Sequence, residues 1–263
     1  MGETKHIRVF TSFSGYNSQC MALDRLAKAH PNFSYELVGW SEIDKYAIQA
    51  HNLLYSQYAD RNFGDICKID WAQVPDFDLF TYSSPCQDFS IAGLQRGGEE
   101  GSGTRSSLLW ECRKAIQAKH PKYLLMENVK ALVSKKFKPT FFKWLNELES
   151  YGYTNFWQVI NAKDCGVPQN RERVFCVSVL NGLIEDYEFP EPTPLDRCIA
   201  DILEDEVDER YYLSDDAVQG FIRTTEDKSH NHNFEPTDGG GIAKVVRCKA
   251  GSRVDDNFIK DAK

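Results

Sequence analysis

The sequence predicts an α/β fold built on a mostly parallel sheet with helices on both faces. Short apolar, β-prone runs alternate with segments whose apolar residues recur at helical spacing. The run at 123–126 is wholly apolar, which is typical of a parallel strand buried on both faces. Polar or glycine-containing turns follow several of these runs, at the strand ends where α/β folds hold their sites.

The elements follow in a regular order. Strands are expected at 7–11, 36–40, 78–82, 123–126, 154–160 and 174–180. Helical spacing follows the turn at 14–17, then Asp44, and returns at 108–116 and 141–148, where Gly152 ends the last helix. Residues 65–66 form a third short unit that leads toward the strand at 78–82.

The charge of the chain is unevenly distributed. The net charge is −8, yet residues 1–180 hold 21 Lys and Arg against 19 Asp and Glu, whereas 181–263 hold 10 against 20. We therefore expect a main domain at 1–182 and a separate region at 183–263. That region opens with a proline-rich linker, contains a short helical stretch near Ile199, and shows no clear periodicity just beyond Tyr212. The overall acidity does not exclude nucleic acid from a cleft in the main domain.

The cysteines and the apolar runs indicate the compartment. Eight cysteines are spread through the chain without a C-x-x-C pair or histidines at zinc-finger spacing, which favours free thiols, a reducing compartment and no metal site. No apolar run approaches the roughly 20 residues that span a bilayer, and the first residues lack a signal core. We expect a soluble cytoplasmic protein with no membrane partner.

Cys86 is the candidate nucleophile. It follows Pro85 at the end of an expected strand and opens a glycine-rich loop, 83–104, that is long enough to act as a mobile lid. A cysteine is more often a small buried residue, so its neighbours decide its role. No histidine lies near it in the sequence, which disfavours a Cys–His hydrolase, and Arg171 and Arg173 are the candidate cations that would favour the thiolate.

Three other strand ends carry suitable groups. Gly15, in the turn at 13–18, lets a ligand approach backbone N–H groups, although the turn lacks the other glycines of a dinucleotide fingerprint. Glu42 is suited to accept hydrogen bonds from ribose hydroxyls. Glu127 ends an apolar strand, where a partly desolvated carboxyl holds its proton more readily and can share it with a ring nitrogen. Together with the thiol of Cys86, these groups favour addition to a polarised heterocycle over amide hydrolysis, and we expect them in one crevice.

Taken in order, these residues resemble the conserved blocks of the DNA cytosine-5 methyltransferases. The resemblance covers roughly residues 7–180. The blocks that carry it are Phe13-Ser14-Gly15, Glu42, Asp65-Ile66, Pro85-Cys86-Gln87 with Phe89-Ser90 and Gly93, 104–108, Glu127-Asn128-Val129 and 169–173. It implies a Rossmann-like methyltransferase fold, S-adenosylmethionine as co-substrate, and double-stranded DNA whose target cytosine is flipped out of the helix.

The resemblance also implies a role for each site residue. Cys86 attacks ring carbon 6, Glu127 binds N3 and the amino group, Arg173 holds the carbonyl oxygen, and Arg171 supports the base and the backbone. Carbon 5 then takes the methyl group, and loss of its proton expels the thiol. The implied cofactor contacts are Phe13, Ser14, Gly15, Glu42, Ile43, Asp65, Ile66, Pro85 and Leu108, and the implied DNA contacts are Gln87, Ser90 and Arg105.

The chain departs from the family in two places. Asn17 stands where a glycine is usual, which predicts weakened or adjusted cofactor binding. The last two blocks are not found before Lys263, so we expect a partial target recognition region, with a longer chain or a second polypeptide supplying the rest, and little methylation by this chain alone. The alternatives are a transfer RNA cytosine-5 methyltransferase and a non-catalytic nucleic-acid-binding module.

Overall fold

The computed structural model describes residues 4–85, 105–184, 186–226, 233–246 and 252–260, with the backbone alone at 105–107. The chain forms two compact units. The first comprises Met1–Val159 and Arg173–Phe189, and the second comprises Ile160–Glu172 and Pro190–Lys263. The first unit contains most of the predicted site residues.

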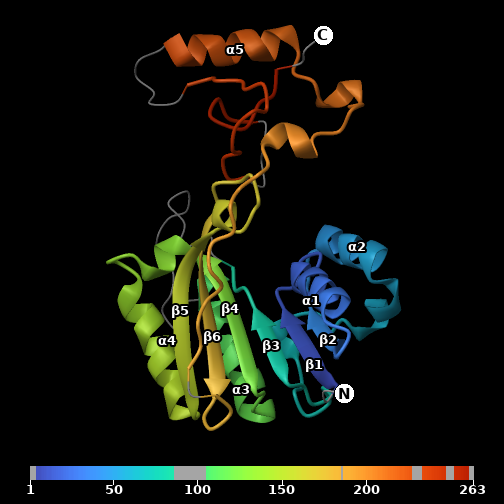
Figure 1. The fold of residues 1–263 in the computed structure, drawn as a ribbon, viewed down its shortest axis with the longest axis vertical. Coiled ribbons are helices and arrows are strands. Elements are labelled where there is room, and N and C mark those ends of the chain that lie inside the picture. Colours follow the sequence, from blue (N-terminus) through green and yellow to red (C-terminus); the bar gives the residue numbers. More distant parts are fainter. Residues whose placement is uncertain (1–3, 86–104, 185, 227–232, 247–251, 261–263) are drawn as a thin grey trace. The chain divides into compact units, whose positions relative to one another are not determined.

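A six-stranded sheet forms the centre of the first unit, in the order β2-β1-β3-β4-β6-β5 (Figure 1). Its strands are β1 (Lys5–Ser12), β2 (Phe33–Ser41), β3 (Leu79–Tyr82), β4 (Tyr123–Val129), β5 (Tyr153–Asn161) and β6 (Glu172–Leu180). The first four strands in the sheet order run parallel, and β6 runs antiparallel to β4. The predicted mostly parallel sheet is confirmed, and the carboxyl ends of β1 to β4 lie at one edge.

Helices cover both faces of the sheet, as predicted. The longer ones are α1 (Ser18–Ala29), α2 (Lys45–Leu54), α3 (Cys112–Lys119) and α4 (Lys138–Ser150). Successive residues of a strand point to opposite faces. Val9 packs with Cys20 of α1 on one face, whereas Phe10 belongs to the cluster that contains Ile116 of α3 and Phe141 of α4 on the other.

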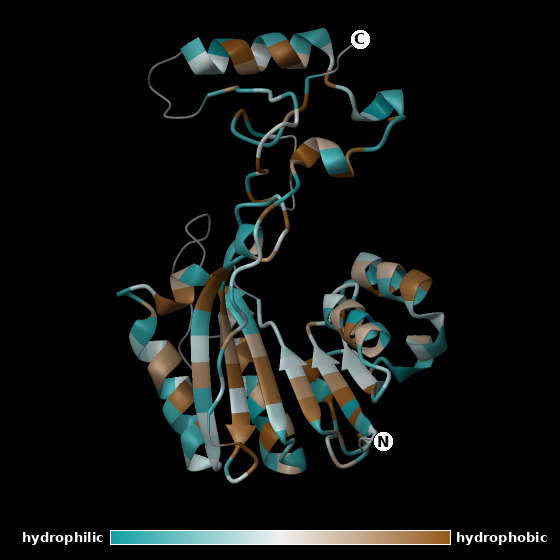
Figure 2. Cartoon of the chain, in the orientation of Figure 1, coloured by the Kyte–Doolittle hydropathy of each residue, from teal (hydrophilic) through white to brown (hydrophobic). Residues whose placement is uncertain are grey.

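The larger of these two clusters is rich in aromatic side chains. The Phe10 ring lies 5.2 Å from that of Trp71 and 6.1 Å from that of Phe80, measured between ring centroids. The Trp144 indole N–H donates to the Tyr82 hydroxyl at 3.1 Å, so even its polar atom is satisfied. Burying each large apolar side chain contributes roughly 1.5–3 kcal/mol, which gives the strand ends a rigid support. Figure 2 shows the apolar bands along the central strands.

Several short 3₁₀ helices lie between the strands and the longer helices. They are η1 (Ser56–Arg61), η2 (Ile66–Lys68), η3 (Arg105–Glu111), η4 (Lys130–Val133) and η5 (Ala162–Asp164), the last of which falls in the second unit. Of these, η2, η3 and η4 lie in the segments that follow β2, precede α3 and follow β4. They therefore shape the loops at the site edge of the sheet.

The second unit contains η6 (Ile199–Ile202), η7 (Glu209–Tyr211) and one longer helix, α5 (Asp215–Glu226). The helix α5 lies in a segment where the sequence shows no clear periodicity and predicts no helix. The Ser214 hydroxyl accepts the Ala217 N–H at 3.3 Å at the start of the helix. Two aspartates occupy the first turn, where their negative charge interacts favourably with the positive end of the helix dipole. Phe221 then packs against Phe234 and Phe258, with ring centroids 5.4 and 5.3 Å away, so packing stabilises a largely polar helix.

Candidate active site

Glu127 and Arg173 form an ion pair on neighbouring strands. Val129 of β4 lies directly opposite Arg173 of β6, so Glu127, two residues earlier on the same face, is the diagonal neighbour of Arg173. The Arg173 Nε lies 2.9 Å from Oε1 of Glu127, and the two side chains are 16% and 27% exposed. The antiparallel register therefore joins two of the predicted catalytic residues at the carboxyl end of β4.

Asn128, the next residue of β4, connects this strand end to the predicted nucleophile loop. Its side chain is buried, and its Nδ2 lies 3.2 Å from the Ser84 carbonyl oxygen and 3.3 Å from the Ser84 hydroxyl oxygen. Its Oδ1 accepts the Val129 N–H at 2.9 Å. Ser84 and Pro85 follow β3, so the chain enters position 86 from the strand that pairs with β4.

The turn after β1 is held by a buried polar network. Ser14 is buried, and its hydroxyl lies 2.7 Å from the Thr11 hydroxyl and donates to the Thr11 carbonyl oxygen at 2.9 Å. Asn17 Nδ2 donates to the same Thr11 hydroxyl oxygen at 3.2 Å. Phe13, Gly15 and Asn17 all have positive φ (55°, 56° and 68°), which only glycine adopts without strain. The network therefore fixes an unusual backbone path.

Glu42 joins this turn to the end of β2. One carboxylate oxygen, Oε2, accepts the Gly15 N–H at 2.9 Å, while Oε1 accepts the N–H groups of Ile43 and Asp44 at 2.8 and 3.0 Å. Asp44 in turn caps α2 through the N–H groups of Tyr46 and Ala47. The carboxylate is thus held in a fixed orientation at the sheet edge, and Oε2, which accepts a single N–H, keeps further acceptor capacity.

The segment at Asp65 and Ile66 lies beside the same strand end. Asn62 pairs with Trp40 of β2, and the Ser41 hydroxyl donates to the Gly64 carbonyl oxygen at 2.6 Å. Ile66 is buried, whereas the Asp65 carboxylate caps η2 by accepting the Cys67 N–H at 3.0 Å. The short helix η2 contacts η3, which contains Leu108.

These groups suit S-adenosylmethionine. A Cβ built on Gly15 would meet no atom within 4 Å, so the turn has open space beside its backbone. Oε2 of Glu42 offers a fixed acceptor for a ribose hydroxyl, and the adjacent Ile43 is 71% exposed, which gives apolar surface available to a base. The chemistry of the residues in this turn therefore matches the cofactor that the resemblance implies.

Arg171 belongs to the second unit. Its backbone N–H donates to Oδ1 of Asn161 at 2.9 Å, and its carbonyl oxygen accepts the Ala162 N–H at 3.0 Å. The Asn161 Nδ2 also donates to Oδ1 of Asn170 at 2.7 Å. These bonds define the backbone at the predicted arginine.

Four predicted site residues lie wholly or partly outside the described residues. Cys86, Gln87 and Ser90 fall within 86–104, and only the backbone of Arg105 is described, at the start of η3. Over the part of the chain that the structure describes, no group of three or more His, Cys, Asp or Glu side chains could hold a metal ion. Within that same part, no helix is long and apolar enough to cross a membrane.

A comparison with known protein families identifies the family of the chain. The model of the C-5 cytosine-specific DNA methylases matches residues 8–256. The chain belongs to this family. In this methylase, the carboxyl edge of the sheet therefore carries the Glu127–Arg173 pair and the turn in which Gly15 binds Glu42.

Relatives of this methylase include one bacterial and one phage methyltransferase. It is 44% identical to the type II methyltransferase M2.ScrFI of Lactococcus lactis subsp. cremoris, over 81% of this chain and 71% of that protein. It is 32% identical to the orphan methyltransferase M.Rho11sI of Bacillus phage rho11s, over 84% of this chain and 48% of that protein. The chain thus spans about half the length of some of the relatives it matches.

A solved structure shares the methylase fold at lower identity. The Dnmt2 methyltransferase of S. pombe aligns with a TM-score of 0.62 at 20% identity, over 89% of this chain and 68% of that chain. At this identity the likeness supports the fold alone. The Rossmann-like methyltransferase architecture is confirmed.

Proposed function

We propose that the protein is a DNA cytosine-5 methyltransferase that modifies a flipped-out cytosine in double-stranded DNA through a covalent adduct of Cys86. The single observation that carries this proposal is the Glu127–Arg173 ion pair at the end of β4, next to the strand that leads into Pro85. A carboxylate and a guanidinium on one strand edge match the polar edge of cytosine, which presents N3, an amino group and a carbonyl oxygen.

Each of the four catalytic residues has a separate role in the proposed reaction. The Cys86 thiolate forms a bond to ring carbon 6 of the cytosine. Glu127 binds N3 and the amino group and shares a proton with N3, while Arg173 donates to the carbonyl oxygen, so that both stabilise the electron density that attack sends into the ring. Arg171 supports the base and its backbone. After carbon 5 has taken the methyl group, loss of its proton to water re-forms the double bond between carbons 5 and 6 and expels the Cys86 thiolate.

S-adenosylmethionine supplies the methyl group when it is bound. The residues that would hold it are those of the turn, Phe13, Ser14 and Gly15, together with Glu42, Ile43, Asp65, Ile66, Pro85 and Leu108. The fixed Glu42 carboxylate and the open space beside Gly15 support this assignment. Gln87, Ser90 and Arg105 would contact the DNA. Residues 1–182 would form the catalytic domain, and residues 183–263 would belong to the target recognition region. The protein would act in the cytoplasm.

Transfer of a labelled methyl group tests the proposal. Duplex DNA containing many cytosines is incubated with the protein and S-adenosyl[methyl-³H]methionine, and the DNA is digested to nucleosides. The expected product is a small amount of labelled 5-methylcytosine, because little methylation is expected of this chain alone, and Cys86→Ser should abolish it. A parallel reaction with transfer RNA separates the alternative substrate, since label in RNA and not in DNA would overturn the assignment.

A further inference from the structure

One segment of the first unit is strongly basic. Between Asn128 and Asn146 the sequence contains five lysines and no aspartate, glutamate or arginine, in a chain whose net charge is −8. Three of these lysines, Lys135, Lys136 and Lys138, are exposed and lie within four consecutive positions. We call these three residues the lysine cluster. So dense a positive charge in an acidic protein is typical of a surface that meets an anion.

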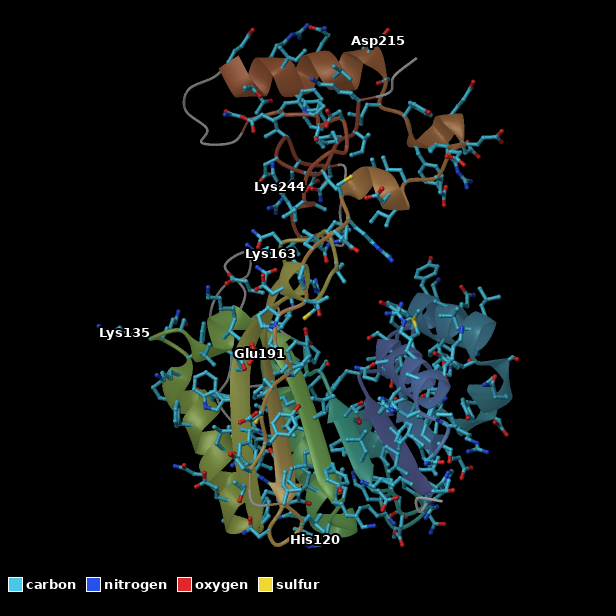
Figure 3. All side chains as sticks on the ribbon, viewed as in Figure 1. His120, Lys135, Lys163, Glu191, Asp215 and Lys244 are labelled. Carbon is cyan, nitrogen blue, oxygen red and sulfur yellow. The ribbon has the colours of Figure 1, made fainter. Side chains whose placement is uncertain are left out.

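The lysine cluster lies at the site edge of the sheet. β4 runs toward this edge and ends with Glu127, Asn128 and Val129, after which η4 leads directly to Lys135. In Figure 3 the Lys135 side chain extends away from this end of the unit, whereas His120, which precedes β4, lies at the opposite end. A polyanion held at the lysine cluster therefore lies on the same edge as the Glu127–Arg173 pair.

The backbone that carries the cluster is fixed on both sides. Leu132 and Phe137 are buried in the main core. Between them, the Ser134 carbonyl oxygen accepts the N–H groups of Phe137 and Lys138 at 3.1 and 2.8 Å. The turn that presents the lysines is thus formed before any partner binds, so binding orders mainly the side chains.

Two ammonium groups of the cluster lie beside aromatic rings. The Lys136 Nζ lies 5.2 Å from the centroid of the Phe137 ring, and the Lys138 Nζ lies 5.5 Å from that of Phe142. Farther along α4, the Lys143 Nζ lies 4.8 Å from the Trp110 ring. A cation held beside a ring loses some of its conformational freedom before any partner binds, which lowers the entropy cost of binding a repeated anion such as a phosphate backbone.

We propose that the lysine cluster binds the phosphate backbone of duplex DNA whose target base enters the site at Glu127. This inference rests on the proposed function, because it takes DNA as the substrate. A run of lysines is often only a solvated surface. This one follows β4, the strand that carries Glu127, and lies on the turn held by the Ser134 carbonyl oxygen. Phosphate contacts carry no sequence information, so the cluster anchors any duplex and leaves the choice of sequence to other residues.

Salt dependence of DNA binding tests the proposal on the full chain. The affinity for a fluorescein-labelled duplex of random sequence is measured by anisotropy at several salt concentrations. Each phosphate contact contributes about 0.9 to the slope of log affinity against log salt. The double variant Lys135→Gln with Lys138→Gln should therefore lower the slope by about 2 and leave the thermal unfolding midpoint unchanged.

Two exposed lysines on the other side of the unit give a charge-matched control. Lys5 begins β1, and Lys28 lies in the last turn of α1. The double variant Lys5→Gln with Lys28→Gln removes the same charge and should keep the wild-type slope. Equal slopes for wild type and the cluster variant, or equal losses in both double variants, would overturn the proposal, as would failure of the wild type to bind duplex DNA.

Methyl transfer is measured separately on the same proteins. If no methylation occurs but the slope depends on the lysine cluster, the proposed function fails and the DNA-binding surface stands. If methylation occurs and the slope does not depend on the cluster, the surface alone is wrong. A slope that changes for transfer RNA but not for duplex DNA would assign the surface to RNA and contradict the proposal.

Discussion

The Arg173 guanidinium lies 2.9 Å from the Glu127 carboxylate, although the two residues are 46 positions apart in the sequence. Their contact depends on the antiparallel pairing of β6 with β4, which makes them diagonal neighbours on one face. Both side chains are more than two-thirds covered, so each holds the other in place at the strand end. The pair is thus formed before a base binds.

Replacing Glu127 with Gln should lower the methylation rate by about 10²–10⁴-fold, because the side chain keeps its shape but no longer shares a proton with the base. The measurement is the single-turnover rate on duplex DNA. Glu147→Gln is the matched control, since Glu147 also pairs with an arginine, Arg113, but on α3 and α4. Equal rate losses in the two variants would contradict the role of Glu127.

Replacing Glu42 with Gln should weaken S-adenosylmethionine binding by about tenfold or more, since one hydrogen bond to a charged group contributes roughly 1.5–3 kcal/mol. The Gln amide group would face either the Gly15 N–H or those of Ile43 and Asp44, so the turn would shift. Isothermal titration calorimetry measures the dissociation constant. Glu36→Gln, earlier on β2 and paired with Arg61, should leave it unchanged.

Replacing Asn17 with Ala should destabilise the protein by about 1–2 kcal/mol, because alanine is strained at the φ of 68° that Asn17 adopts. Asn17→Gly should lower the free energy of unfolding less, since glycine tolerates this backbone and only the bond to Thr11 is lost. Urea unfolding compares the two variants. An alanine variant as stable as the glycine variant would show that backbone strain is unimportant here.

The free energy of unfolding should fall as the pH drops below about 6.5, the ordinary pKa of histidine, in part because of His51. The His51 ring is buried and stacks on Trp40 with centroids 3.7 Å apart, and burial lowers the pKa of His51. The unfolded chain therefore takes up this proton at a higher pH than the folded chain, so protonation favours unfolding.

The variant His51→Phe tests this contribution by urea unfolding at about pH 7.5 and about pH 5.5. Phenylalanine can occupy the stacked position but cannot bind a proton, so the loss of stability between the two pH values should be smaller than in the wild type. An unchanged pH dependence would show that other groups cause the effect.

Local sequence patterns predicted the sheet better than the helices. All six strands were found, because each is a short β-prone run bounded by turns. The α1 pattern is helical as predicted, yet two of the apolar residues in it, Met21 and Leu26, are 38% and 41% exposed, because spacing indicates a helix but not which part of it is covered. The helix α5 was missed because its stability comes from Phe234 and Phe258, which lie outside it.

The position of a site residue could be predicted from the sequence only where that residue directly follows a strand. Glu42 and Gly15 each follow a strand, so their position at one edge could be inferred, but their direct hydrogen bond required the backbone. The Glu127–Arg173 contact required the register of an antiparallel strand. The lysine cluster was overlooked because it adds no catalytic group, although five lysines without an acid were visible in the sequence.

Covalent capture of DNA tests the central proposal most directly. A duplex that carries 5-fluorocytosine blocks the loss of the carbon 5 substituent, so a true nucleophile stays bound to the base after methyl transfer. With S-adenosylmethionine, the wild type and the exposed-cysteine control Cys165→Ser should both form an adduct that survives denaturing electrophoresis, and Cys86→Ser should form none. An adduct that persists in Cys86→Ser, or no adduct in the wild type, would contradict the account.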